Sequence, residues 1–253
     1  MPYAYSRPAG YWSGRLPAGV KWLLIVNVGL FLLQFFSVNL ARRDPFAALA
    51  LAPWQVLERG YVWQLATYLF LHGGLMHLLF NMLTLWMFGM DLERDWGTRA
   101  FLRYYFLCGV GAGLCVIVAN LLWGDPFTRT LGSSGAIYGL LLAYGLLYPE
   151  RTVLFFFLFP IQAKYFVLIV GAIAFLGSFQ AAGSGISHVA HLGGMLFGYL
   201  SLRSRLRARH RRTYLRPSLF GRLREQWRQW KIRRARRKFE VYMRRHDRDR
   251  WSR

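Results

Sequence analysis

The sequence has few acidic residues and almost no cysteine. Its 253 residues include 11 Asp and Glu against 33 Lys and Arg, which gives a formal net charge of +22. The two cysteines are Cys108 and Cys115, and two turns of helix between them would separate them by about 10 Å, too far for a disulfide bond. We interpret both as packing residues that carry no information about the redox compartment.

The lack of acids also bears on metal binding. The chain has no H-E-x-x-H motif, and no carboxylate or cysteine stands beside His72, His77, His188 or His191. The spacing His188-x-x-His191 is acceptable for a metal site. The other ligands that transition metals favour are missing, however, so we expect no metal and no cofactor.

The positive charge is concentrated at one end of the chain. Residues 203–253 hold 21 Lys and Arg and 4 Asp and Glu, a balance of +17, so the first 202 residues carry only +5. Phe220, Leu223, Trp227 and Trp230 recur in this tail at helical spacing. The pattern predicts a basic amphipathic helix on anionic lipid. A solvated extension is the alternative, and nucleic-acid binding is less favoured because membrane proximity already explains the charge.

The body of the chain is too apolar for an ordinary soluble domain. Apolar residues make up 55% of the sequence and aromatic residues 17%, which is typical of a polytopic membrane protein. We expect no cleavable signal before the first apolar run, because the polar start lacks an A-x-A site. A spanning helix needs about 17–25 apolar residues, and six segments qualify. They are residues 22–40, 73–90, 101–123, 132–148, 164–180 and 186–202.

One apolar stretch does not qualify as a span. Residues 152–163, TVLFFFLFPIQA, are apolar, but the stretch is short and contains Pro160. We interpret it as an interfacial stretch or as the start of the fifth span, and a re-entrant loop is a third reading.

Six spans place both termini on one side of the membrane. Arg7, Arg15, Lys21 and the basic tail then share that side, so the positive-inside rule predicts cytoplasmic termini. The expected organisation is a short cytoplasmic N-terminus over residues 1–19, a membrane domain over 20–202 and a cytoplasmic tail over 203–253. We expect a cell membrane, and the start of the chain is compatible with a prokaryotic plasma membrane.

Three spans carry polar residues at a similar depth, one or two turns below the outer surface. His77 and Asn81 stand early in the second span, Ser134 begins the fourth, and His191 stands early in the sixth. Polar groups inside a membrane indicate a functional site. A histidine can take the proton of a serine hydroxyl and make it a nucleophile. Because no acid lies at this depth, we expect a Ser–His dyad rather than a triad.

Small residues allow the two spans of this dyad to approach closely. Gly194 and Gly198 share a face with His191, and Gly135-x-x-x-Gly139 forms a similar strip beside Ser134. Tyr138, one turn after Ser134, is placed to stack on the imidazole. His77, Asn81 and the Ser134 backbone N–H are candidate donors to an oxyanion.

These residues resemble the motifs of the rhomboid intramembrane serine proteases. The G-x-S-G motif is present at Gly132–Gly135, A-H-x-x-G-x-x-x-G at residues 190–198, and H-x-x-x-N at His77–Asn81. The resemblance covers roughly residues 20–202, with the motifs in family order. It implies a six-helix bundle with a membrane-embedded loop between the first two helices. It also implies Ser134 as nucleophile, His191 as general base, oxyanion support from His77, Asn81 and the Ser134 amide, and close helix packing at the motif glycines, Gly132 included.

One position departs from the resemblance. Many rhomboids have Trp-Arg in the loop after the first helix, whereas this chain has Trp63-Gln64. The change removes a charge from the usual anchor of the loop, which puts the rigidity of the loop in question rather than the dyad, and the sequence leaves its consequence open.

The function that follows is an intramembrane serine endopeptidase acting on transmembrane segments of other proteins near the extracytoplasmic face. A catalytically silent adaptor that binds client helices is the alternative, although a binder needs neither Ser134 nor His191. A transporter is disfavoured because the spans hold no buried carboxylate and no pair of broken helices.

Overall fold

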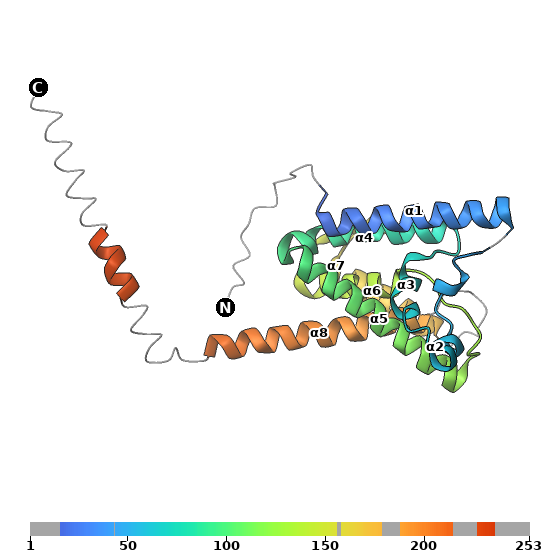
Figure 1. The fold of residues 1–253 in the computed structure, drawn as a ribbon. Helices are drawn as coiled ribbons and strands as arrows, with labels where there is room; N and C mark the ends of the chain where they lie inside the picture. The colour runs from blue at the N-terminus through green and yellow to red at the C-terminus, as the bar shows by residue number, and fades with distance from the viewer. Residues whose placement is uncertain (1–15, 43, 156–157, 179–187, 215–226, 236–253) are drawn as a thin grey trace, which may run out of the picture. The chain divides into compact units, whose positions relative to one another are not determined.

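The fold is mostly helical. A computed structural model of the chain describes residues 16–42, 44–155, 158–178, 188–214 and 227–235 (Figure 1). The elements are α1 (Ala18–Ala41), η1 (Ala47–Leu49), α2 (Pro53–Arg59), α3 (Gln64–Thr67), η2 (Tyr68–Phe70), α4 (Leu75–Trp96), α5 (Thr98–Trp123), α6 (Ser134–Leu147), β1 (Thr152–Phe155), β2 (Phe159–Gln162), α7 (Ala163–Gly177) and α8 (His188–Tyr214). The chain divides into two units, Met1–Arg203 and Ser204–Arg253.

Three helices in the described residues are long and apolar enough to cross a membrane, namely α1, α4 and α5. They coincide with the predicted spans 22–40, 73–90 and 101–123. Helices α6 and α7 are apolar but have only 14 and 15 residues, fewer than the roughly 17 that a span requires. The other three crossings therefore remain predictions.

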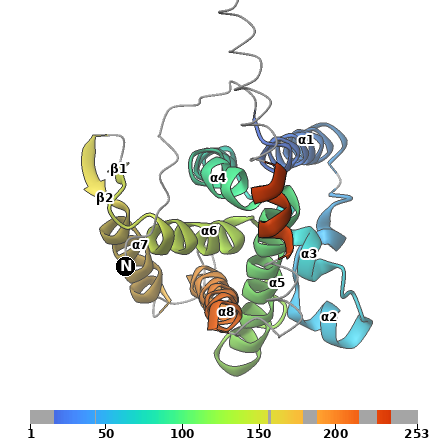
Figure 2. The same cartoon turned by 90° about the vertical axis from the view of Figure 1, so that its left-hand side faces the viewer.

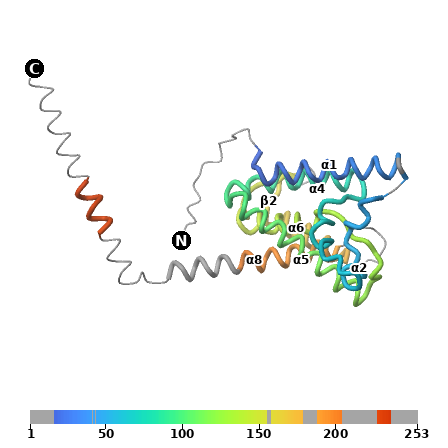
Figure 3. The backbone as a smooth tube through the Cα atoms, in the orientation of Figure 1, coloured from blue at the N-terminus to red at the C-terminus, as the bar shows by residue number. Residues whose placement is uncertain are grey.

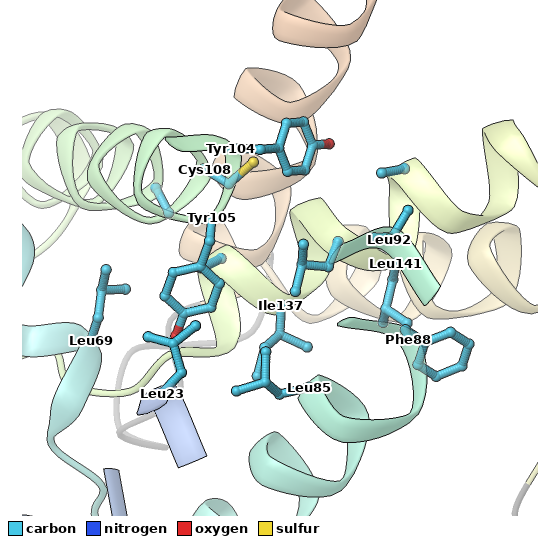
Figure 4. Packing of buried hydrophobic residues seen from close by; sticks show 14 of the residues in the cluster. Leu23, Leu69, Leu85, Phe88, Leu92, Tyr104, Tyr105, Cys108, Ile137 and Leu141 are labelled. Carbon is cyan, nitrogen blue, oxygen red and sulfur yellow. The ribbon is translucent and has the colours of Figure 1, made fainter. Parts of the chain in front are cut away.

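The core of the first unit lies where α4 and α5 meet the other helices. Helix α4 packs against both α1 and α6, and α5 packs against α6 (Figure 2). Leu85 and Phe88 of α4 lie toward Ile137 and Leu141 of α6 (Figure 4). Tyr105 of α5 is fully buried among these apolar side chains. This packing fixes α6, whose first residue is Ser134.

A buried carboxylate, which lies in α4 beyond the end of the predicted span 73–90, joins α1 to α4. The side chain of Glu93, near the end of α4, accepts hydrogen bonds from the backbone N–H groups of Gly19 and Val20, both at 2.7 Å. The Thr98 hydroxyl donates a third bond to the same carboxylate at 2.6 Å. The first amides of a helix have no hydrogen-bond partner within the helix, and a negative charge there interacts favourably with the positive end of the helix dipole. Glu93 thus caps α1 from another helix.

Replacing Glu93 with glutamine is expected to lower the free energy of unfolding by about 1–3 kcal/mol, because one buried amide then loses its acceptor. Thermal unfolding in detergent measures the change. Glu58→Gln is the matched control, since Glu58 is exposed on α2 and should leave the melting temperature unchanged. Equal melting curves for Glu93→Gln and the unsubstituted chain would contradict the capping role.

The segment between α1 and α4 is folded rather than extended. Its short helices α2 and α3 pack against α5 (Figure 3). The backbone of Leu51 pairs in both directions with that of Thr130, at 2.9 and 2.8 Å. The segment is therefore attached to the residues that lead into α6.

The stretch after α6 forms a β-hairpin instead of helix. Strands β1 and β2 are antiparallel, with Thr152 opposite Gln162 and Leu154 opposite Pro160. The prediction that this stretch begins the fifth span is wrong, because α7 starts only at Ala163. Consecutive β-branched and aromatic residues favour a strand, and Pro160, which has no N–H, is tolerated on an edge strand.

The second unit contains a short helix over residues 227–235. Trp227 and Trp230 are exposed on it, and Lys231 and Arg234 lie over their rings at 3.7 and 5.1 Å from the centroids. Phe220 and Leu223 of the predicted amphipathic helix lie outside the described residues.

Candidate active site

Ser134 and His191 are in hydrogen-bond contact. Ser134 is the first residue of α6 and is half-buried, whereas His191 stands in the first turn of α8 and is 6% exposed. The Ser134 Oγ and His191 Nε2 atoms are 2.9 Å apart. A neutral imidazole nitrogen at this distance is able to accept the proton of the hydroxyl. The pair therefore has the geometry of a nucleophile with its base.

The ring of Tyr138 lies flat on that of His191. Their centroids are 4.0 Å apart and the planes differ by 5°. Tyr138 is one helical turn after Ser134, so a single face of α6 carries both the hydroxyl and the ring that restricts the imidazole. Within the described part of the chain, His191 Nδ1 has no hydrogen-bond partner. Among the described residues, the His191 imidazole is therefore held by stacking on Tyr138 rather than by a carboxylate.

Glycines bring the two helices into contact. A Cβ atom on Gly194 would lie 1.8 Å from the Gly135 carbonyl oxygen, and one on Gly139 would lie 3.0 Å from that of Gly194. A Cβ on Gly198 would come within 3.3 Å of the Gly139 Cα atom. Only hydrogen fits at the closest of these points. The helices thus approach at the distance that the Ser134–His191 bond needs.

Gly194→Ala is expected to destabilise the protein by about 1–3 kcal/mol and to abolish any activity of the Ser134–His191 pair, because the added methyl meets backbone that cannot turn away. Thermal unfolding and a cleavage assay measure the two effects. The matched control is Gly29→Ala on α1, where an added Cβ meets nothing within 4 Å. That substitution should be neutral or stabilising by up to about 1 kcal/mol. Full activity in Gly194→Ala would contradict close contact between the helices.

His77 lies against the residue that begins the G-x-S-G motif. Gly132 has a φ of 122°, which favours glycine, and a Cβ there would lie 2.7 Å from His77 Cε1. The motif therefore needs glycine at this position for both its backbone and its space. His77 Nε2 and Asn81 Nδ2 are buried without a hydrogen-bond partner among the described residues. Buried polar atoms without partners are rare in native structures and suggest a ligand-binding role.

The serine loop is tied to the folded segment before α4. The Gly132 N–H donates to the Tyr68 carbonyl at 2.9 Å, and the Tyr68 hydroxyl donates to the Gly109 carbonyl of α5 at 2.7 Å. Together with the Leu51–Thr130 pair, these bonds fix the chain just before Ser134.

Gln64 anchors this segment without a charge. Its side chain is fully buried, and its Oε1 accepts from the Ala52 N–H at 3.1 Å. Its Nε2 donates to the Ala48 carbonyl at 3.0 Å and to Gln55 Oε1 at 2.7 Å. The amide thus makes three hydrogen bonds and leaves no buried charge to neutralise, so the segment has an anchor at this position although the charge is absent.

Two polar residues near the pair had no predicted role. His72 Nε2 lies 3.3 Å from Ser133 Oγ, and both residues are buried. Burial, and secondarily the neighbouring His77, lower the pKa of His72 to about 3. His72 is therefore neutral at physiological pH. Nothing in the sequence spacing of these two residues signalled their contact.

The four histidines do not form a metal centre in the described part of the chain, where no group of three His, Cys, Asp or Glu is placed to hold an ion. His188 lies edge-on to His191, with 5.8 Å between ring centroids, and its ring packs against Gly177 at the end of α7.

The fold and the site describe a multi-pass membrane protein with a serine and a histidine brought together by two closely packed helices. The rhomboid domain pattern matches residues 59–207 of the sequence. The chain belongs to the rhomboid family.

Individual relatives agree with this assignment. Over 178 residues the chain is 30% identical to rhomboid protease GluP of Bacillus subtilis, a match that covers 69% of this chain and 33% of GluP. It is 34% identical over 163 residues to rhomboid-like protease 5 of Toxoplasma gondii, covering 59% of this chain and 17% of that protein. A third relative is the mitochondrial rhomboid protein 1 of Saccharomyces cerevisiae, 29% identical over 164 residues, with 59% and 44% covered. The chain thus matches less than half the length of each of these three relatives.

Proposed function

We propose that the protein is an intramembrane serine endopeptidase that uses Ser134 as nucleophile and His191 as general base. The observation that carries this proposal is the 2.9 Å distance between Ser134 Oγ and His191 Nε2. The names of relatives such as rhomboid protease GluP support the same class of activity.

The reaction proceeds in two halves. Ser134 Oγ attacks the carbonyl carbon of the scissile peptide bond while His191 Nε2 takes the hydroxyl proton. The tetrahedral intermediate collapses, the C–N bond breaks, and His191 gives the proton to the leaving amine. Water then attacks the acyl-enzyme with His191 again as base, which releases the new carboxylate and restores Ser134. The Tyr138 stack keeps the imidazole oriented through both halves.

The oxyanion of the intermediate requires hydrogen-bond donors. His77 Nε2, protonated in the matching tautomer, and Asn81 Nδ2 are proposed to provide two, since both are buried and unpartnered among the described residues. The Ser134 N–H at the start of α6 is a third donor, because the first amides of a helix have no internal acceptor.

The proposed substrates are transmembrane segments of other membrane proteins. A helix hides its carbonyl groups in backbone hydrogen bonds, so cleavage requires local unwinding near the serine. Segments with small or helix-destabilising residues near their outer end are the expected clients. No cofactor or metal takes part in this chemistry.

The proposed topology has six membrane crossings with both termini in the cytoplasm and the site near the extracytoplasmic face. The bias of Lys and Arg supports this orientation in a cell membrane, with a prokaryotic plasma membrane as the expected host. The segment between α1 and α4 is proposed to lie in the membrane. The exposed Trp227 and Trp230, flanked by basic residues, support contact between the tail and anionic lipid rather than nucleic acid.

A silent adaptor is the second candidate, since some relatives are named rhomboid-like without a stated activity, as is rhomboid-like protein 15 of Arabidopsis thaliana. An adaptor binds clients through the helices alone. It has no need for a hydroxyl in contact with an imidazole, and this contact favours the protease.

The test uses the purified chain in liposomes with a single-span reporter protein and a fluorophosphonate probe. A protease should cut the reporter in or beside its transmembrane segment, and the probe should modify the peptide that contains Ser134. Protein treated first with the probe is the control and should no longer cut. A reporter that binds but stays intact, together with no labelling at Ser134, would favour the adaptor.

A further inference from the structure

A second histidine–serine pair lies directly beside the proposed dyad. His72 Nε2 is 3.3 Å from Ser133 Oγ. His72 is 2% exposed and Ser133 is 0% exposed, so no substrate reaches this hydroxyl. Burial excludes a second nucleophile and leaves a structural or positioning role.

Each member of the pair contacts a part of the proposed catalytic machinery. Ser133 directly precedes Ser134, and its carbonyl accepts the Ile137 N–H at 3.1 Å in the first turn of α6. The His72 ring packs edge-on against His77, with 5.2 Å between centroids. His77 in turn lies against Gly132. His72 lies just before α4, which carries the proposed oxyanion donor His77. Ser133 lies just before α6, which begins with the proposed nucleophile Ser134. The His72–Ser133 bond therefore joins the starts of these two helices.

Other hydrogen bonds that hold this region are made by backbone atoms. The Gly132–Tyr68 and Leu51–Thr130 bonds are made by the backbone and hold the chain upstream of Ser133. At the junction of loop and helix, the His72–Ser133 bond joins two side chains.

We propose that His72 and Ser133 form a positioning pair that fixes the distance between the nucleophile Ser134 and the oxyanion donor His77. The pair acts through its neighbours and touches no reacting atom. This inference rests on the proposed function, because it assigns the pair to the same site.

The test combines single and double substitutions. Ser133→Ala removes the hydroxyl, and His72→Phe keeps a ring of similar size without its nitrogens. Each should lower kcat for a reporter substrate about tenfold, the order expected for one neutral hydrogen bond, while KM stays within about twofold. The double variant should lose no more than Ser133→Ala alone, since both substitutions remove the His72–Ser133 bond and Ser133→Ala also removes the hydroxyl that interacts with Tyr105. His72→Gln, which restores a hydrogen-bonding group, should recover part of kcat.

Thr128→Ala is the matched control. Its exposed hydroxyl bonds Asp125 in the same connecting segment at 3.3 Å, and its loss should leave kcat unchanged. Three results would contradict the proposed positioning role. They are an unchanged kcat in Ser133→Ala, a rise in KM alone, and losses of kcat that multiply in the double variant.

Hydrogen exchange separates this inference from the proposed function. In Ser133→Ala the amides of residues 131–136 should exchange faster than in the unsubstituted chain, whether or not the protein cuts a reporter. Faster exchange in a protein that neither cuts the reporter nor is labelled at Ser134 would show that the bond orders the loop, but it would refute the protease and with it the positioning role. Unchanged exchange and unchanged kcat in an active protein would refute the pair and leave the protease intact.

Discussion

Ser134→Ala is expected to reduce reporter cleavage by about 10⁴-fold or more. The substitution removes the only atom that forms a bond to the substrate, and alternative nucleophiles at the position would be water molecules that the site does not orient. The fold should not change, because the half-buried serine loses only an oxygen. Cleavage of a single-span reporter in liposomes, followed with time by gel or mass spectrometry, measures the effect.

The control is Ser37→Ala on α1, which removes a serine hydroxyl from a different helix and should leave the rate unchanged. Equal melting temperatures for the three proteins would show that the loss is chemical. Cleavage at the normal rate by Ser134→Ala would refute Ser134 as the nucleophile.

His191→Ala is expected to abolish labelling of Ser134 by a fluorophosphonate and to lower cleavage about 10⁴-fold. Without the imidazole 2.9 Å away, the hydroxyl keeps its proton and reacts as an ordinary alcohol. The rate of probe incorporation, followed by in-gel fluorescence, reports on the base separately from substrate binding.

His188→Ala provides the comparison, since it removes a histidine from the same helix one turn earlier. It should retain most of the labelling, because His188 makes an edge contact with His191 rather than a bond to Ser134. Undiminished labelling in His191→Ala would remove His191 as the base.

The placement of the site could be predicted because its spacing is local. Ser134 and Tyr138 are one turn apart, and His191 shares a helix face with Gly194 and Gly198. Each of these arrangements follows from helix geometry alone and does not depend on the rest of the fold. The two helices then have to meet at their glycines. The structure brings Ser134, Tyr138 and His191 together, while their roles in catalysis remain proposals for the experiments above.

Contacts between distant residues could not be predicted in this way. His72 and Ser133 are 61 positions apart and meet through the fold of the segment between α1 and α4. That segment has no single hydrophobic periodicity, since it combines two short α-helices and two 3₁₀ helices with turns. Gln64 is another contact that the sequence could not predict. The sequence shows that a charge is absent, but it does not show the one donor and two acceptors that hydrogen-bond the amide.

The hairpin after α6 was missed for a different reason. A short apolar run gives no periodicity that separates strand from buried helix. In residues 152–162 the outcome depends on the pairing of Thr152 with Gln162, which only the folded chain makes visible.

The shortness of α6 determines how water and lipid meet the serine. A helix of 14 residues extends about 21 Å, whereas the hydrocarbon layer is about 30 Å thick. In a bilayer of that thickness, roughly 9 Å of hydrophobic depth has no α6 beside it. A bilayer that is locally thinner, a hydrated recess, or other segments of the chain would account for this depth. With α6 as the proposed fourth crossing and the shortfall on the side of Ser134, the hydroxyl at its first residue would lie below the membrane surface, which is where the proposed hydrolysis would take place.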